Sequence, residues 1–173
     1  MKKSLLILVF LFSLSLQSQN LIFVGNNSYK ATKPWFFKGN GDQFKYYAND
    51  ATIQVGRKGQ SYILSISTKV YDATSGIKGT IRVYLNDGSA IVLSKTFSKD
   101  YSDQYSTVIF QLSPSDISKL KKSDINTIRF NSGLSGQLEG TTASNRWFEI
   151  IDPYSPNVVR EINWSTANDI SQL

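Results

Sequence analysis

Acid–base chemistry in this 173-residue chain would fall to carboxylates, because the sequence contains neither histidine nor cysteine. Glutamate occurs at three positions only, and most aspartates lie in turn-like contexts: Glu139, Glu149 and Glu161, with Asp42, Asp87, Asp100 and Asp103. Glu149 stands between Phe148 and Ile150 in an expected strand, where burial could raise its pKa. An outward-facing strand residue is the simpler interpretation. A carboxylate-based secreted hydrolase is therefore kept as an alternative function.

The missing residue types also exclude several classes of site. Ser-His-Asp and Cys-His nucleophile sites cannot be built, and neither can ordinary zinc sites. The segments Asn86–Gly88 and Asp100–Asp103 supply too few oxygen ligands, in the wrong spacing, for a calcium loop. We therefore predict no catalytic residue, no metal site and no cofactor.

Aromatic residues are the best candidates for binding. Trp35-Phe36-Phe37 and Tyr46-Tyr47 flank one expected hairpin, and neighbouring strand residues point to opposite faces. At least one residue of each group should therefore face outward, where a flat ring can stack on a sugar or anchor a protein. We predict Trp35, Tyr46 and Trp147 as binding residues for a glycan or a protein ligand. The alternative is that a second layer, such as the C-terminal segment with Trp164, covers them.

Period-two patterns predict the strands that would position these residues. Tyr62, Leu64 and Ile66 share a face, as do Ile81, Val83 and Leu85, and as do Val108, Phe110 and Leu112. Turn residues separate such runs: Gly39–Asp42 before a strand at 44–48, Lys58-Gly59, and Asp87-Gly88 as a two-residue type I′ turn. The spacing predicts an all-β fold, an antiparallel β-sandwich of about eight to ten strands, for which jelly-roll-like connectivity is one form.

One short helix should follow Ser113, an N-cap serine with Pro114 at N1 and Asp116 at N3. We expect it to plug one end of the sandwich. The glycine-rich stretch from Ser132 to Asn145 is typical of a long loop, and Arg146–Ile151 of a strand. Residues 158–164 fit either a strand or a helix, and residues 165–173 are predicted to be a frayed tail.

The N-terminus predicts export. Lys2 and Lys3 precede an apolar run of about twelve residues and then a polar segment with Ser18, the order of a secretory signal peptide. We expect a signal peptide at 1–19, a single β-sandwich domain at 20–173, no transmembrane segment in the mature chain, and a periplasmic or extracellular location. The formal net charge falls from +6 to +4 when the two leader lysines are removed. The cluster Lys119, Lys121 and Lys122 is interpreted as a solvated helix face, so no nucleic-acid partner is predicted.

The stretch from Ile81 to Phe130 resembles small exported β domains of unknown function from Gram-negative bacteria. The residues that carry the resemblance are Tyr84–Gly88, Asp100–Asp103, Leu112–Ile117 and Ile125–Phe130. The group has no activity to transfer. The predicted function is an exported, non-catalytic binding or accessory module, and the alternatives are the hydrolase and a structural or adhesive envelope protein. The oligomeric state stays open.

Overall fold

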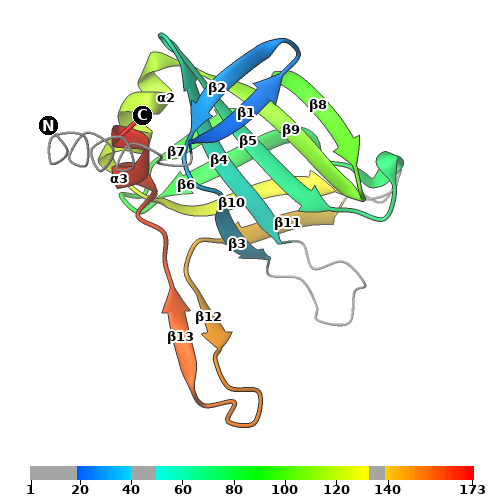
Figure 1. The fold of residues 1–173 in the computed structure, drawn as a ribbon, viewed down its shortest axis with the longest axis vertical. Coiled ribbons are helices and arrows are strands. Elements are labelled where there is room, and N and C mark those ends of the chain that lie inside the picture. The colour runs from blue at the N-terminus through cyan, green and yellow to red at the C-terminus, as the bar shows by residue number, and fades with distance from the viewer. Residues whose placement is uncertain (1–18, 40–49, 133–138) are drawn as a thin grey trace, which may run out of the picture.

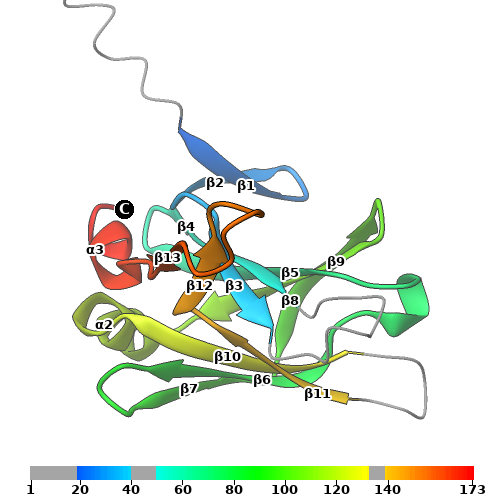
Figure 2. The ribbon, with the colours of Figure 1, turned by 90° about the horizontal axis from the view of Figure 1, so that it is seen from below.

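The computed structural model describes residues 19–39, 50–132 and 139–173, and it has the predicted all-β fold. Nearly all the strands belong to one antiparallel, 11-stranded sheet with the order β7-β6-β10-β11-β3-β4-β5-β9-β8, to which the β1–β2 hairpin is attached through β4. The sheet folds over into two layers, with β6, β7, β10 and β11 in one and β3, β4, β5, β8 and β9 in the other (Figure 2). The layers meet where β11 pairs with β3.

The elements have the following bounds: β1 Asn20–Val24, β2 Asn27–Ala31, β3 Trp35–Gly39, β4 Ala51–Lys58, β5 Ser61–Lys69, η1 Ala73–Ser75, β6 Lys78–Leu85, β7 Ala90–Leu93, β8 Thr96–Ser102, β9 Tyr105–Leu112, α2 Pro114–Lys122, β10 Ile125–Ser132, β11 Glu139–Ser144, β12 Trp147–Ile150, β13 Val159–Ile162 and α3 Thr166–Ser171. The chain order and the spatial arrangement can be followed in Figure 1.

The main core lies between the two layers and is built from alternate strand residues. In β6, Ile81, Val83 and Leu85 are buried, while Arg82 and Tyr84 between them are exposed, as the alternation predicts. The other predicted inward faces behave in the same way, except that Tyr62 is only partly buried. The sandwich is therefore held together by apolar burial.

A second, smaller apolar cluster lies on the outside of the β4–β5–β9 layer. The β1–β2 hairpin folds across this face and buries Ile22, Tyr29 and Ala31 against Ile63 and Ile109. The β4 backbone at Gly56 permits the close approach, because a Cβ atom there would lie only 3.0 Å from the Cβ of Tyr29. The hairpin thus rises above the outer face of the sheet and forms one side of a groove on it.

The hairpin predicted at Asp87-Gly88 is present between β6 and β7, but the type I′ turn is wrong. Gly88 has a φ of +83°, whereas Asp87 is not among the residues with positive φ. The Gly88 N–H donates to the Leu85 carbonyl. Strand β6 ends at Leu85 and β7 begins at Ala90, so the loop is longer than two residues. The two-residue turn with positive φ at both positions is instead Asp103-Gln104, between β8 and β9. The predicted turn at Gly39–Asp42 and strand at 44–48 lie outside the described residues, apart from Gly39 in β3.

The predicted helix is confirmed as α2, and with α3 it covers one end of the sandwich (Figure 1). Ser113 and Asp116 form a capping box, and Ile117 and Leu120 enter the main core. The prediction of a frayed tail at 165–173 is wrong, because this segment forms α3 and Ile170 is fully buried in the same core. The tail is too short to show a helical period, and tertiary contacts order it.

Two further segments differ from expectation or resolve an ambiguity. Residues 139–144, expected as part of a long loop, form β11, whose backbone pairs with β10 along its whole length. Residues 159–162 form strand β13, so the ambiguous segment around them is not helical. Together β12 and β13 make a two-stranded arm that projects from the sandwich (Figure 1).

Candidate ligand-binding face

The candidate site is the outer face of the layer that contains β3, β4, β5, β9 and β8. The strand register aligns one row of side chains across all five strands: Phe36, Thr52, Ser67, Thr107 and Asp100. The adjacent row, counted from β4 to β8, consists of Gln54, Ser65, Ile109 and Ser98. Most of these side chains are neutral and polar. We call the five residues Thr52, Gln54, Ser65, Ser67 and Thr107 the polar strip.

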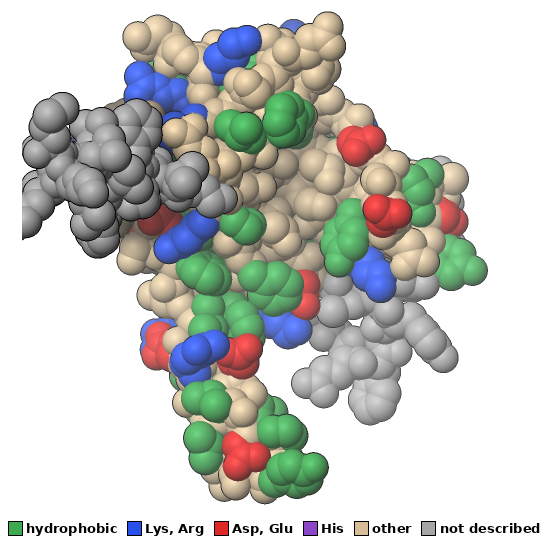
Figure 3. Space-filling model, viewed as in Figure 1, with side chains coloured by type: hydrophobic (Ala, Val, Ile, Leu, Met, Phe, Trp, Pro, Cys, Tyr) green, Lys and Arg blue, Asp and Glu red, His purple; other side chains and the backbone are tan. Residues whose placement is uncertain are grey.

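A groove of about 580 Å³ runs between the polar strip and β1. Its rim includes Leu21 and Phe23 of β1, which are 45% and 69% exposed, and Tyr105 at the start of β9, which is 46% exposed. In the part of the chain that the structure describes, β1 pairs only with β2, so its second edge has backbone N–H and carbonyl groups without a strand partner. Figure 3 shows this face, with hydrophobic side chains above and below a broad area of neutral polar surface.

The polar strip is only partly occupied by its own hydrogen bonds. The Thr107 hydroxyl donates to the Ser67 hydroxyl at 3.0 Å, and the Gln54 amide donates to the Thr32 carbonyl at 3.0 Å. The hydroxyls of Thr52 and Ser65 have no hydrogen-bond partner among the described residues. The strip therefore retains donors and acceptors for a ligand that lies in the groove.

An aromatic cluster continues this face on the side of the arm. Phe36 packs edge-to-face with Trp147, with ring centroids 5.6 Å apart, and the indole N–H groups of Trp147 and Trp164 both donate to the Phe36 carbonyl, at 3.3 and 2.9 Å. Lys38 lies 5.9 Å from the centroid of the Phe36 ring and forms an ion pair with Asp50. These contacts with Trp147, Trp164 and Lys38 hold Phe36 next to Thr52, the first residue of the polar strip in that row.

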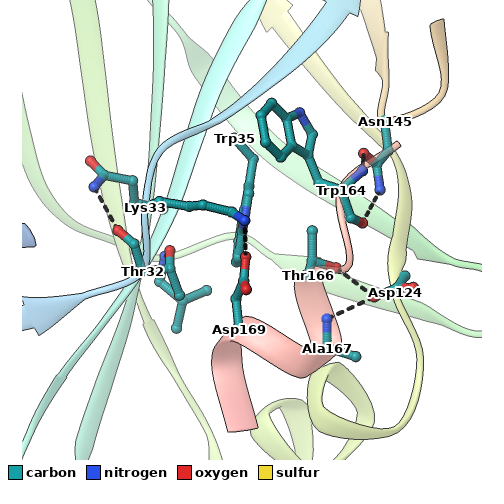
Figure 4. Close-up of polar contacts among 11 residues, drawn as sticks. Thr32, Lys33, Trp35, Asp124, Asn145, Trp164, Thr166, Ala167 and Asp169 are labelled. Atoms are coloured by element: carbon teal, nitrogen blue, oxygen red, sulfur yellow. Dashed lines mark hydrogen bonds and ion pairs between the residues drawn. The ribbon is translucent and has the colours of Figure 1, made fainter. Parts of the chain in front are cut away.

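The structure separates the three predicted binding residues. Trp35 is completely buried, so its prediction as a surface residue is wrong. It is the cross-strand partner of Ile53, and both side chains point into the main core. The Trp35 indole N–H donates to Asp169 at 2.8 Å (Figure 4). Phe36 is the outward member of the pair, as the alternation required, and the predicted cover from Trp164 is present. Trp147 is half-buried against Phe36, and Tyr46 lies outside the described residues.

The C-terminal segment that buries Trp35 is held by a separate polar network (Figure 4). The Asn145 side chain donates to the Ile125 and Trp164 carbonyls and accepts from the Trp164 N–H, all within 2.9 Å. The Ala167 N–H donates to Asp124, and the Ile125 N–H donates to the Thr166 hydroxyl. These bonds place Trp164 beside Phe36 and close the end of the candidate face.

The carboxylates do not form a catalytic pair in the groove. Asp100 is the single carboxylate among the described residues that line it. Glu149 and Glu161 lie on the arm, paired with Arg160 and Arg146 respectively. Two of the described aspartates have a clearly lowered pKa, and in both the cause is hydrogen bonding within a turn. The Thr74 hydroxyl donates to Asp72, and hydrogen bonding from Ser89, whose backbone N–H donates to the carboxylate, lowers the pKa of Asp87. Across residues 19–39, 50–132 and 139–173 no three acidic side chains gather as metal ligands.

The sequence analysis missed the groove itself. Its signal was the run of serine and threonine residues on the outer faces of β5 and β9, which alternation identified only as solvent-facing.

Among the described helices, none has the length and apolar composition needed to cross a bilayer. Comparisons with protein-family models, curated proteins and solved structures each returned no match for this chain. What the face binds has to be inferred from its geometry.

Proposed function

We propose that this protein is an exported, non-catalytic binding module that holds a neutral glycan in the groove between β1 and the polar strip. The observation that carries this proposal is the polar strip of uncharged hydroxyl and amide side chains, which are partly buried, or buried in the case of Ser65, and line the floor of an open groove. A sugar presents hydroxyls that can pair with such groups and an apolar ring face that can stack on an aromatic side chain. Tyr105 and the Phe36–Trp147 cluster offer such aromatic surface at two sides of the strip.

The charge distribution favours binding over hydrolysis. Retaining and inverting glycosidases use two carboxyl groups on opposite sides of the scissile bond, about 5–10 Å apart. Among the described residues that line the groove, Asp100 is the single carboxylate and Lys99 the single cation. The four residues before Asp100 in its row, Phe36, Thr52, Ser67 and Thr107, are neutral. A ligand in this groove would therefore be held but not cleaved. Export is part of the proposal because the apolar run after Lys3 has the order of a signal peptide.

A protein ligand is the second candidate, and the β12–β13 arm favours it. Phe148, Ile150 and Val159 are exposed on the arm, and Tyr154 in its connecting loop is 95% exposed. An isolated two-stranded hairpin is only marginally stable in water, so a partner that covered these side chains would stabilise it.

A glycan array with the purified protein tests the first candidate. We expect binding to at least one neutral glycan, and we expect Tyr105→Ala to weaken it about tenfold because a stacking surface is lost. Thr107→Val, which removes one hydroxyl at nearly constant shape, should also weaken it. The matched control is Tyr84→Ala, since Tyr84 is a partly exposed tyrosine on the opposite layer. Absence of binding to every glycan, or equal loss in the Tyr84 variant, would contradict the proposal.

A further inference from the structure

Two arginines face each other on the outer surface of the opposite layer. Arg82 of β6 and Arg129 of β10 are direct cross-strand partners, and both side chains are exposed. Directly opposed residues of an antiparallel pair have Cβ atoms about 4.5–5.5 Å apart, and like charges in this position are destabilising. The layer is the lower one in Figure 2, remote from the groove described above.

No acidic side chain lies on β6, β7 and β10, the three strands that carry and flank this pair on the β7 side, as far as the structure describes them. The flanking partners are neutral as well, Val92 opposite Arg82 on β7 and Thr142 opposite Arg129 on β11. The next row adds a further positive charge, because Lys78 pairs with Asn131. The charged side chains of β6, β7 and β10 are therefore all cationic.

The other arginines of the chain behave differently. Arg146 and Arg160 form ion pairs with glutamates, and Arg57 donates to the carbonyl oxygens of Gly59 and Leu173. Neither Arg82 nor Arg129 has a hydrogen-bond or ion-pair partner among the described residues. Two guanidinium groups, each with a fork of donors that matches an oxyanion, thus extend from directly paired residues and have no partner among the described residues.

We propose that Arg82 and Arg129 form a binding site for a phosphate monoester group. Such a group carries roughly one and a half to two negative charges near pH 7, and it has three acceptor oxygens. Two adjacent guanidinium forks can donate to these oxygens. Binding would also relieve the repulsion between the two arginines. The site is independent of the glycan groove, so either proposal can fail without the other.

Thermal unfolding in phosphate against chloride, at equal ionic strength, is the first test. We expect inorganic phosphate to raise the melting temperature of the wild-type chain, because a ligand that binds only the folded state stabilises it. The Arg82→Gln/Arg129→Gln variant should show no such rise. It should still fold, and in chloride it should melt no lower than wild type, since the like-charge pair is gone.

Two further variants separate a specific site from general charge. The control Lys30→Gln/Lys122→Gln removes the same number of charges from exposed positions elsewhere, and it should keep the phosphate effect. Arg82→Lys/Arg129→Lys keeps the charge but loses the bidentate fork, and it should weaken phosphate binding about tenfold. The proposal would be overturned if phosphate stabilised the Arg82→Gln/Arg129→Gln variant as much as wild type. It would also be overturned if the Lys30→Gln/Lys122→Gln control lost the phosphate effect.

The pH dependence and the source of the phosphate complete the test. On acidification, phosphate monoesters lose their second negative charge near pH 6, so their affinity for the site should fall from about pH 7.5 to about pH 5. Inorganic sulfate should bind equally at both pH values, because arginine does not titrate in this range. Titration with glucose 6-phosphate and flotation with phosphatidic acid vesicles distinguish a soluble ligand from a lipid headgroup. Binding to either, lost in the double glutamine variant, supports the site; binding to neither overturns it.

Discussion

Substitution of Gly56 should show whether the β1–β2 hairpin is held against the sheet as tightly as the structure indicates. A Cβ atom at this position would lie 3.0 Å from the Cβ of Tyr29, 3.1 Å from Cγ1 of Ile63 and 3.2 Å from Cδ1 of Ile22. Carbon atoms in favourable contact are about 3.5–4.0 Å apart, so all three neighbours would have to move by a few tenths of an ångström. Two of them belong to the hairpin and one to β5, so the simplest relief is to lift the hairpin.

The magnitude follows from two opposing effects. Overpacking a well-filled cluster costs about 1–3 kcal/mol, whereas replacing glycine by alanine lowers the conformational entropy of the unfolded chain and returns about 0.4–1 kcal/mol. Gly56→Ala should therefore destabilise the protein by about 1–2 kcal/mol. Gly56→Val adds two methyl groups to the same space, and it should cost about 3 kcal/mol or more despite the high β-propensity of valine.

Urea unfolding followed by tryptophan fluorescence measures the loss, and native-state hydrogen exchange locates it. We expect the amides of β1 and β2 to lose protection in Gly56→Val while those of β5 and β9 keep most of theirs. Thr52→Val is the matched control on the outer face of the same strand, where the side chain borders the groove and should change stability by about 0.5 kcal/mol or less. A Gly56→Val variant with wild-type stability and wild-type protection of β1 would refute the packing of the hairpin.

Three further outcomes are expected. Asn145→Ala should cost about 2–4 kcal/mol in urea unfolding, because three backbone groups, one in a buried bond and two in part-buried bonds, lose their partner; wild-type stability would contradict this. Ile170→Ala should cost about 2–5 kcal/mol, measured in the same way, whereas a frayed tail would cost nothing. The pKa of Asp72 is lowered in the folded protein, chiefly by the Thr74 hydroxyl, so its stabilising effect is complete above the unfolded value and is lost as the pH falls through the folded value. Asp72→Asn should therefore be less stable than wild type at about pH 7 and lose less stability on acidification below about pH 4; parallel slopes in unfolding experiments across that range would contradict it.

Much of the fold was predictable because its signals are local. The alternation of Ile81, Val83 and Leu85 needs only the period of a strand, and the capping box of Ser113 and Asp116 needs only one turn of helix. The absence of histidine and cysteine excluded whole classes of catalytic and metal site without any structure. The hairpin at Asp87-Gly88 was also found, although its turn type depended on the loop length that the two strands imposed.

The remaining features depend on what packs against what. Alternation required one of Trp35 and Phe36 to face outward, but only the pairing of Trp35 with Ile53 decided which. The tail became α3 because Ile170 found a place in a core built from distant strands, and the groove exists because Gly56 lets a hairpin from the N-terminal region lie across β5 and β9. The opposed arginines likewise meet only through the register of β6 and β10. Alternation, helix capping and turns could be predicted from the residues alone, since these preferences act over a few neighbouring positions. Which face is covered, and which charges lie together, follows from the packed fold, because those contacts join segments far apart in the chain.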